Sequence, residues 1–149
     1  MIKQNMIKEN LSDQFKDKII IVTGSTQGSG AETAKLLASR GAKGITICGR
    51  NEKNGKKVKS AIESLGTECI YVKADLENLK DCKKIISQTD KKFGTVNTLI
   101  NSAAYTGRGT ILSTSQKEYE KMFNVNTRAP FFLMQDVIKI MIREKVKGT

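Results

Sequence analysis

The sequence of 149 residues contains no histidine, no tryptophan and only three cysteines. Histidine and clustered cysteine are the usual ligands of zinc, so their absence argues against a metal centre. Cys48 and Cys69 fall in apolar runs, and Cys82 falls on the apolar stripe of an expected helix, which predicts buried structural thiols. Reduced thiols fit a cytoplasmic protein.

Long apolar runs are also missing. The stretches at 19–22 and 137–142 are far shorter than the roughly 20 residues that cross a bilayer, so we expect no membrane helix. Residues 1–17 mix polar residues with isolated Ile and Met and lack the apolar segment of a secretory signal. We expect them to be a lead-in to a single domain whose core covers about residues 18–147.

Aromatic residues are scarce, at 5% of the chain, although the formal net charge is +11. A basic chain raises the question of nucleic-acid binding. The lysines are dispersed over expected helix faces, however, and few rings are available to stack on bases. We therefore expect a solvated basic surface and no specific nucleic-acid site. A basic nucleic-acid binder is the minor alternative, and it predicts tight, salt-dependent binding to duplex.

Patterns typical of strands and helices alternate along the chain. Strands are expected at 18–23, 45–48, 69–73 and 96–101, and helices at 31–40, 51–65, 77–93 and from Ser115 to about Lys145, with a break at Pro130 left open. This alternation implies right-handed crossovers and a doubly wound parallel sheet of the α/β class, with strand order 3-2-1-4.

Helical periodicity also assigns the inward faces of these helices. The second helix is expected to bury Val58, Ala61, Ile62 and Leu65, and the third Leu79, Cys82, Ile86 and Phe93. Ser115 and Glu118 have the spacing of a capping box at the start of the last helical region.

A glycine-rich segment, Gly24-Ser25-Thr26-Gln27-Gly28-Ser29-Gly30, lies between the first expected strand and the first expected helix. A pyrophosphate needs backbone N–H groups with no Cβ in the way, and it favours the positive end of a helix. The position of the segment, after a strand and before a helix, supplies both conditions. We predict a phosphate-binding loop. A plain strand-to-helix turn is the less favoured alternative, because such a turn rarely needs three glycines.

With Thr23 before it, this loop resembles the Thr-Gly-x-x-x-Gly-x-Gly motif of the short-chain dehydrogenases/reductases. Three later segments resemble the same family in the same order. Asp75 matches an aspartate that hydrogen-bonds the adenine amino group, and residues 99–104 match an Asn-Asn-Ala-Gly segment that touches the cofactor ribose. Asn124-Val125-Asn126 matches an Asn-Val-Asn stretch whose second asparagine, here Asn126, belongs to the catalytic set.

The resemblance implies a Rossmann-type oxidoreductase that transfers hydride between a nicotinamide cofactor and a small carbonyl or alcohol substrate. An acid at the end of the second strand is typical of NAD sites, whereas Arg50 follows that strand here, which favours NADP over NAD. Asn126 is the implied catalytic residue. The implied cofactor-binding residues are Gly24, Ser25, Thr26, Gly28, Ser29, Gly30, Arg50, Asn51, Asp75, Leu76, Asn101 and Ala103.

Several positions depart from the family pattern. Ser29 replaces the usual Ile, and Ser102 and Ala104 replace Asn and Gly. None of the three tyrosines is followed four residues later by lysine, so the family's Tyr-x-x-x-Lys, expected after a fifth strand, is missing from the 149 residues. We expect the cofactor-binding half of an enzyme, inactive alone. The alternative is a non-catalytic nucleotide-binding or interaction module.

The order 3-2-1-4 leaves the fourth strand at an edge of the sheet, and such an edge attracts other chains. The last helix is unusually apolar, which together with this edge predicts a homo-oligomer or an aggregating chain. Its apolar residues are Phe131, Phe132, Met134, Val137, Ile138, Met141 and Ile142.

Overall fold

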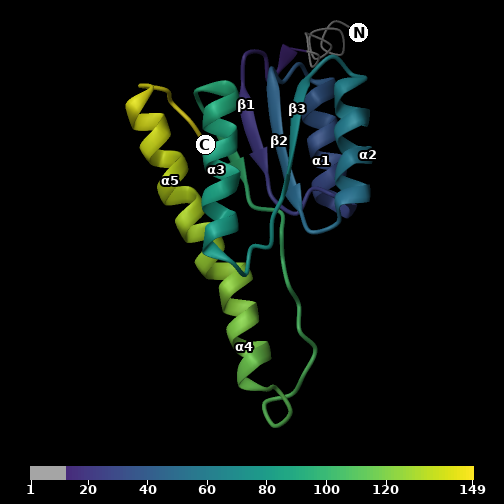
Figure 1. The fold of residues 1–149 in the computed structure, drawn as a ribbon, viewed down its shortest axis with the longest axis vertical. Coiled ribbons are helices and arrows are strands. Elements are labelled where there is room, and N and C mark those ends of the chain that lie inside the picture. Colours follow the sequence, from purple (N-terminus) through teal and green to yellow (C-terminus); the bar gives the residue numbers. More distant parts are fainter. Residues whose placement is uncertain (1–12) are drawn as a thin grey trace, which may run out of the picture.

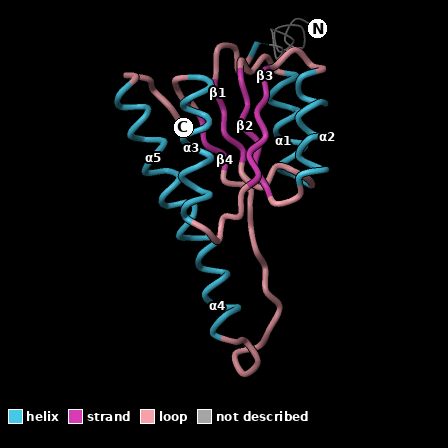
Figure 2. The backbone as a smooth tube through the Cα atoms, in the orientation of Figure 1, coloured by secondary structure: helices cyan, strands magenta, loops and turns pink. Residues whose placement is uncertain are grey.

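A computed structural model of the chain describes residues 13–149. Four parallel strands form one sheet in the order β3-β2-β1-β4, which confirms the predicted fold class and strand order. Helices α1 and α2 cover one face of this sheet, and α3 and α5 cover the other (Figure 1, Figure 2). The elements are β1 (Ile19–Val22), α1 (Gly28–Ser39), β2 (Gly44–Gly49), α2 (Glu52–Glu63), β3 (Glu68–Lys73), α3 (Leu79–Phe93), β4 (Thr98–Ile100), α4 (Gln116–Phe123), the π-helical segment η2 (Asn124–Arg128) and α5 (Ala129–Arg143).

The predicted lead-in lies only partly within the described residues, because residues 1–12 are outside them. Phe15 donates its N–H to the carbonyl of Arg40 at 2.9 Å, and Lys16 forms an antiparallel bridge with Ala42. Phe15 also packs against the buried cluster beneath α1 and α2. Residues 13–17 therefore contact the sheet domain directly.

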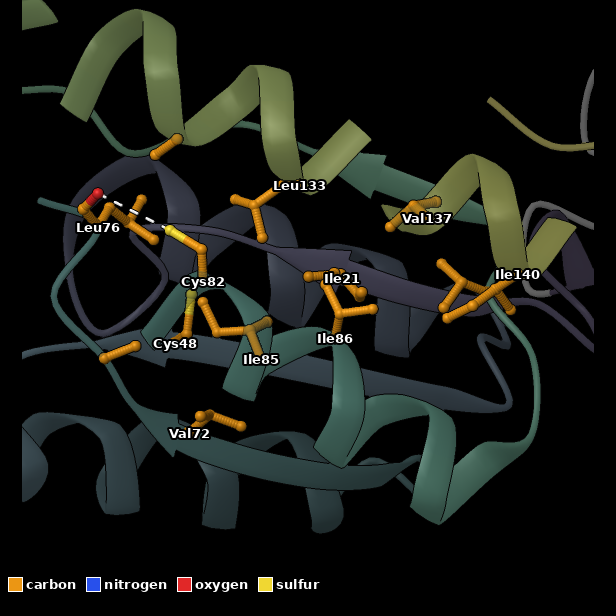
Figure 3. Close-up of a cluster of buried hydrophobic side chains, with 13 residues drawn as sticks. Ile21, Cys48, Val72, Leu76, Cys82, Ile85, Ile86, Leu133, Val137 and Ile140 are labelled. Carbon is orange, nitrogen blue, oxygen red and sulfur yellow. Dashed lines mark hydrogen bonds between the residues drawn. The ribbon is translucent and has the colours of Figure 1, made fainter. Parts of the chain in front are cut away.

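The apolar run of β1 lies in the centre of the molecule, and its side chains alternate between the two faces of the sheet. Ile20 and Val22 pack beneath α1 and α2, whereas Ile21 packs beneath α3 and α5 (Figure 3). All three side chains are fully buried. Burial of each such side chain stabilises the fold by about 1.5–3 kcal/mol, which explains why this strand has no polar position.

Two expected helix faces differ in detail from the observed ones. Helix α2 ends at Glu63, two residues early, and Gly66 then adopts a φ of +87°. Leu65 therefore lies outside the helix and is 49% exposed, so its predicted burial is wrong. In α3, Ile85 is fully buried although the predicted face omits it. The buried stripe of this helix is wider than the i, i+3, i+7 spacing used for the prediction.

The last helical region is interrupted upstream of Pro130 rather than at it. Residues 124–128 form a π-helical segment, and Pro130 lies in the first turn of α5. Proline has no N–H, and its ring clashes with the carbonyl four residues earlier, here that of Asn126. The distortion therefore falls on the turn before the proline. Such π segments are frequent at functional sites.

The outer edge of β4 is partly occupied by the residues that follow α5. Thr149 donates its N–H to the carbonyl of Asn97 at 2.9 Å and accepts from the N–H of Leu99 at 3.0 Å. These two bonds have the pattern of a parallel bridge. The expectation of a fully open edge is therefore wrong at this position.

Residues 101–123, called the arm below, extend from the carboxyl ends of the strands away from the sheet and its helices (Figure 1, Figure 2). No residue of α4 is buried. Ile111 and Leu112, in the turn that precedes α4, are 97% and 94% exposed. Across residues 13–149, none of the helices combines the length and the apolar character that crossing a bilayer requires.

Candidate functional site

A cavity of about 670 Å³ lies where the strands end at their carboxyl termini. Ligands of open α/β sheets bind at this end, and the volume falls in the range of small-molecule sites. The predicted site residues that line the cavity are Gly24, Thr26, Gly28, Ser29, Arg50, Asn51, Asp75, Leu76 and Ala103. The structure therefore brings together nine residues from the four segments that follow the strands.

The glycine loop passes so close to its neighbours that two of its glycines leave no room for a side chain. A Cβ on Gly24, whose φ is +62°, would lie 2.6 Å from the Cα of Ala103. A Cβ on Gly30 would lie 2.5 Å from the carbonyl oxygen of Gly24. The absence of a side chain at these two glycines thus allows the loop, the start of α1 and the segment after β4 to pack in direct contact. Gly30 itself does not line the cavity.

Helix α1 begins at Gly28, three residues earlier than the sequence pattern predicts. Its N-cap residue, Gln27, makes no capping hydrogen bond with its side chain, and the first turn contains no acidic residue. The first N–H groups of a helix have no partner within it, and they carry a partial positive charge. This helix end therefore offers an anion both hydrogen-bond donors and a favourable field.

Two hydroxyl groups beneath the loop fix its position. Thr23 Oγ1 accepts from the N–H groups of Ser102 at 3.1 Å and Ala103 at 3.2 Å, which joins β1 to the segment after β4. Ser25 Oγ donates to the carbonyl of Val22 and accepts from the N–H of Cys48 at 3.0 Å. Ser25, predicted to contact a cofactor, is fully buried behind the cavity and braces β1 against β2.

The end of β2 presents a cation to the cavity and no carboxylate. Arg50 is exposed and lines the cavity, and Asn51 caps α2 by accepting from the N–H of Asn54 at 3.0 Å. The first acid after β2, Glu52, pairs with Lys56 at 2.7 Å. The hydrogen bond and charge of Lys56 lower the pKa of Glu52.

Asp75 lines the cavity after β3, in a loop held from two sides. Its Oδ1 accepts from the N–H of Glu77 at 3.1 Å, and its own N–H donates to Asp81 Oδ2 at 2.8 Å. Leu76 beside it is buried and joins the cluster under α3 (Figure 3). The carboxylate of Asp75 therefore has a fixed place in the wall.

Asn126 lies in the π-helical segment and does not line the cavity. Its Oδ1 accepts from the N–H of Tyr105 and its Nδ2 donates to the carbonyl of Tyr105, both at 2.8 Å. The Asn126 side chain thus bonds both backbone groups of Tyr105, a residue of the arm. Asn101, also predicted as a contact, is exposed and lies outside the cavity wall.

Tyr105 and Lys121 line the cavity, although the sequence reading did not assign them to the site. The Tyr105 hydroxyl donates to Glu118 Oε2 at 2.8 Å, and this hydrogen bond raises the pKa of Tyr105. The Lys121 ammonium lies 4.2 Å from the centre of the Tyr105 ring. Tyr105 therefore keeps its proton at neutral pH and is not activated as an acid.

The capping box is only half formed. Ser115 Oγ accepts from the N–H of Glu118 at 3.2 Å. The Glu118 carboxylate accepts from the Tyr105 hydroxyl instead of from the N–H of Ser115. No sequence pattern could have found this contact, because it joins a loop residue to a helix that lies 13 positions away. Cys48 and Gly49, by contrast, line the cavity because they end β2 directly before Arg50.

The cysteines are free and buried, as predicted. Burial raises the pKa of the Cys48 thiol to about 12, so this thiol is not a nucleophile at neutral pH although it borders the cavity. Residues 13–149 contain no group of three metal-ligating side chains.

A family model described as short chain dehydrogenase matches residues 18–149. The chain belongs to the short-chain dehydrogenase family. Among curated relatives, an uncharacterized oxidoreductase of Thermotoga maritima is 32% identical over 87% of this chain and 51% of its own length. A CLA biosynthesis dehydrogenase/reductase of Lactiplantibacillus plantarum is 33% identical over 88% of this chain and 46% of its own length.

Solved structures of this family have the same fold. A Serratia marcescens short-chain dehydrogenase/reductase mutant superimposes with a TM-score of 0.81 at 25% identity, over 84% of this chain and 51% of its own. A metagenomic short-chain oxidoreductase in complex with NADP has a TM-score of 0.83 at 24% identity, over 89% of this chain and 60% of its own. This short-chain dehydrogenase therefore spans about half the length of the curated relatives that it matches.

Proposed function

We propose that this family member binds NADP(H) and forms the cofactor-binding part of an oxidoreductase that transfers hydride between the nicotinamide and a small carbonyl or alcohol substrate. The observation that supports this most is the cavity itself. It joins the uncapped start of α1 to Arg50 and Asp75 at the carboxyl ends of parallel strands. A dinucleotide needs this combination of anion site, ribose site and base site.

The pyrophosphate, the adenine and the 2′-phosphate of the cofactor each have a proposed partner in the wall. The N–H groups at the start of α1 hold the pyrophosphate, and the Asp75 carboxylate accepts from the adenine amino group. Arg50 binds a 2′-phosphate through paired N–H donors. When bound, the cofactor supplies the hydride. Asn126 keeps its proposed place in the catalytic set. Its two hydrogen bonds to the Tyr105 backbone hold that part of the cavity wall in position.

The preference for NADP over NAD follows from the charge after β2. Arg50 lines the cavity, and the nearest following acid, Glu52, is paired with Lys56. The metagenomic neighbour with this fold is in complex with NADP. An NAD site would need an acid that accepts from the ribose 2′-hydroxyl.

Calorimetric titration of NADPH and NADH tests this preference. We expect NADPH to bind at least about tenfold more tightly, since a charge-assisted contact contributes about 1.5–3 kcal/mol. Arg50→Ala should reduce the difference. Lys53→Ala is the matched control, because Lys53 is an exposed cation of α2 outside the cavity. Equal affinities for the two cofactors in the unmodified protein would contradict the proposal.

The second candidate function is a nucleotide-binding module without catalysis. Tyr71, Tyr105 and Tyr119 are followed four residues later by Asp75, Gly109 and Phe123, so none has the lysine partner. Without a positioned acid, hydride transfer to a carbonyl forfeits a factor of about 10² to 10⁴. We expect the 149 residues alone to bind adenosine 2′,5′-bisphosphate without oxidising NADPH in the presence of a broad carbonyl panel. Robust turnover would contradict this expectation.

We also propose that a second copy of the chain covers the outer face of α5. Phe131, Ile138 and Ile142 are 56%, 52% and 71% exposed and recur at helical spacing along α5, and contiguous exposed apolar residues mark interaction sites. Two residues predicted to add to this surface do not: Val137 is buried, and Met141 packs against the core. A monomer mass by light scattering at tens of micromolar would contradict the proposal.

The three free thiols support a reducing, cytoplasmic location as part of the same proposal. A disulfide between any two of them in protein purified under non-reducing conditions would argue against it.

A further inference from the structure

The arm supplies the cavity with a second cation. Among the basic residues that the structure describes, Arg50 and Lys121 are the ones that line the cavity, and they come from different segments of the chain. Arg50 follows β2, whereas Lys121 lies in α4. Arg50 is near enough to Tyr105 for its charge to offset part of the rise in the Tyr105 pKa. Both cations therefore line the same cavity as Tyr105.

Lys121 is held in place without an ion pair. Its ammonium lies over the Tyr105 ring, a contact that attracts a cation to the electron-rich face of the ring. Glu118, one turn earlier on α4, is engaged by the Tyr105 hydroxyl. Within residues 13–149, no carboxylate lies within salt-bridge distance of Lys121. Its charge is therefore available to a ligand.

The charges around the cavity favour a polyanion. Its wall carries the cations Arg50 and Lys121 and one acid, Asp75, together with the positive end of α1. Some helix lysines are paired with acids on the surface, for example Lys56 with Glu52 and Lys59 with Glu63. Lys121 differs from the other lysines of the described helices because it lines the cavity.

We propose that Lys121 contacts a phosphate group of the bound nucleotide, with Tyr105 as the platform that positions its ammonium. This inference rests on the proposed nucleotide binding and deepens it, because it adds a specificity-determining residue from the arm. The phosphate is either the 2′-phosphate beside Arg50 or the pyrophosphate at the start of α1. Both are anions that a lysine ammonium recognises as a point charge.

The test is calorimetric titration of adenosine, ADP and adenosine 2′,5′-bisphosphate against the unmodified protein, Lys121→Met and Lys117→Met. Lys117 is the matched control, because it is an exposed lysine of the same helix outside the cavity. We expect Lys121→Met to weaken binding of a phosphorylated probe about tenfold and to leave adenosine unchanged. The loss should shrink at high salt. Lys121→Arg should retain most of the affinity.

The pattern across the probes identifies the phosphate. A loss confined to the bisphosphate assigns the contact to the 2′-phosphate, and a loss shared with ADP assigns it to the pyrophosphate. An unchanged affinity of Lys121→Met, or an equal loss for adenosine, overturns the inference and leaves nucleotide binding intact. Failure of the unmodified protein to bind any of the probes overturns both proposals. Thermal melting of each variant verifies that it is folded.

Discussion

The sheet with α1, α2, α3 and α5, which we call the body, and the arm are stabilised in different ways. In the body, side chains such as Ile20, Ile47 and Ile85 are fully buried between helix and strand. In the arm, no residue of α4 is buried; Glu118 of α4 bonds the Tyr105 hydroxyl, and Asn126 of η2 bonds the Tyr105 backbone. The body therefore obtains its shape from packing and the arm from a few hydrogen bonds. Since both contribute to the cavity wall, the site combines a rigid side with a weakly held one.

The largest effect should come from matched isoleucines in the two regions. Ile47→Ala in β2 should lower the free energy of unfolding by about 2–5 kcal/mol, because it removes buried methyl groups and leaves a cavity. Ile111→Ala in the arm should change it by less than about 0.5 kcal/mol, because Ile111 is 97% exposed. Urea unfolding measures both. Similar losses for the two variants would show that the arm is packed in solution.

Gly30→Ala tests the close packing of the body where it borders the cavity. The new Cβ would lie 2.5 Å from the Gly24 carbonyl oxygen, so the glycine loop must shift. We expect a loss of about 1–3 kcal/mol in stability, typical of overpacking, together with weaker NADPH binding. Ser29→Ala, an exposed change one residue earlier, is the control and should leave stability unchanged. Normal NADPH affinity in Gly30→Ala would contradict the role of the close contact.

The body was predictable from sequence because its signals are local and repeated. The apolar run of β1 indicated a strand buried on both faces, and helix α3 ends where predicted, at Phe93, directly before Gly94 with a φ of +73°. The end of α2 was less certain, although Gly66 with a φ of +87° follows that helix. The α2 helix stops before Leu65, and the periodicity alone could not show this.

The arm was not predictable to the same degree. Its first half has no periodicity, and its key contacts join Tyr105 to residues 13 and 21 positions away. Asn126 was assigned a role through family resemblance, but its hydrogen bonds to the Tyr105 backbone depend on the π-helical geometry of its segment. Lys121 was one lysine among many in the sequence, and only the fold places it at the cavity.

Asn126→Ala should loosen the arm while leaving the body folded. It removes two hydrogen bonds to the Tyr105 backbone, which contribute about 0.5–1.5 kcal/mol each. We expect faster hydrogen exchange at the Tyr105 amide and faster proteolysis within residues 101–115. Exchange in β1 should be unaffected. Unchanged protection of Tyr105 would show that other contacts hold the arm.

The smallest effect concerns an ion pair inside the body. Arg143 of α5 bonds both carboxylate oxygens of Asp90 in α3, at 2.6 and 2.9 Å, and it lowers the pKa of Asp90 below its usual 3.8. A carboxylate with a lowered pKa stabilises the fold above its unfolded-state pKa, and this contribution is lost as pH falls through the folded-state value. Asp90→Asn should therefore lower Tm slightly at neutral pH.

The Tm difference between the unmodified protein and Asp90→Asn should be measured as a function of pH. The gap in Tm between the unmodified protein and Asp90→Asn should be constant above about pH 5 and should close below about pH 4. Asp136→Asn, which removes a partner of Lys139 within α5 alone, is the control. A gap that persists at low pH would show that Asp90 acts through packing rather than charge.

The buried thiols have a practical consequence for studying this molecule. Burial raises the pKa of Cys48 and Cys69 to about 12 and that of Cys82 to about 11, so the folded protein should react slowly with alkylating reagents. Each thiol becomes reactive only when its own element opens: β2, β3 or α3. The rates of alkylation, resolved by mass spectrometry, would therefore time the opening of three parts of the sheet domain without any introduced label.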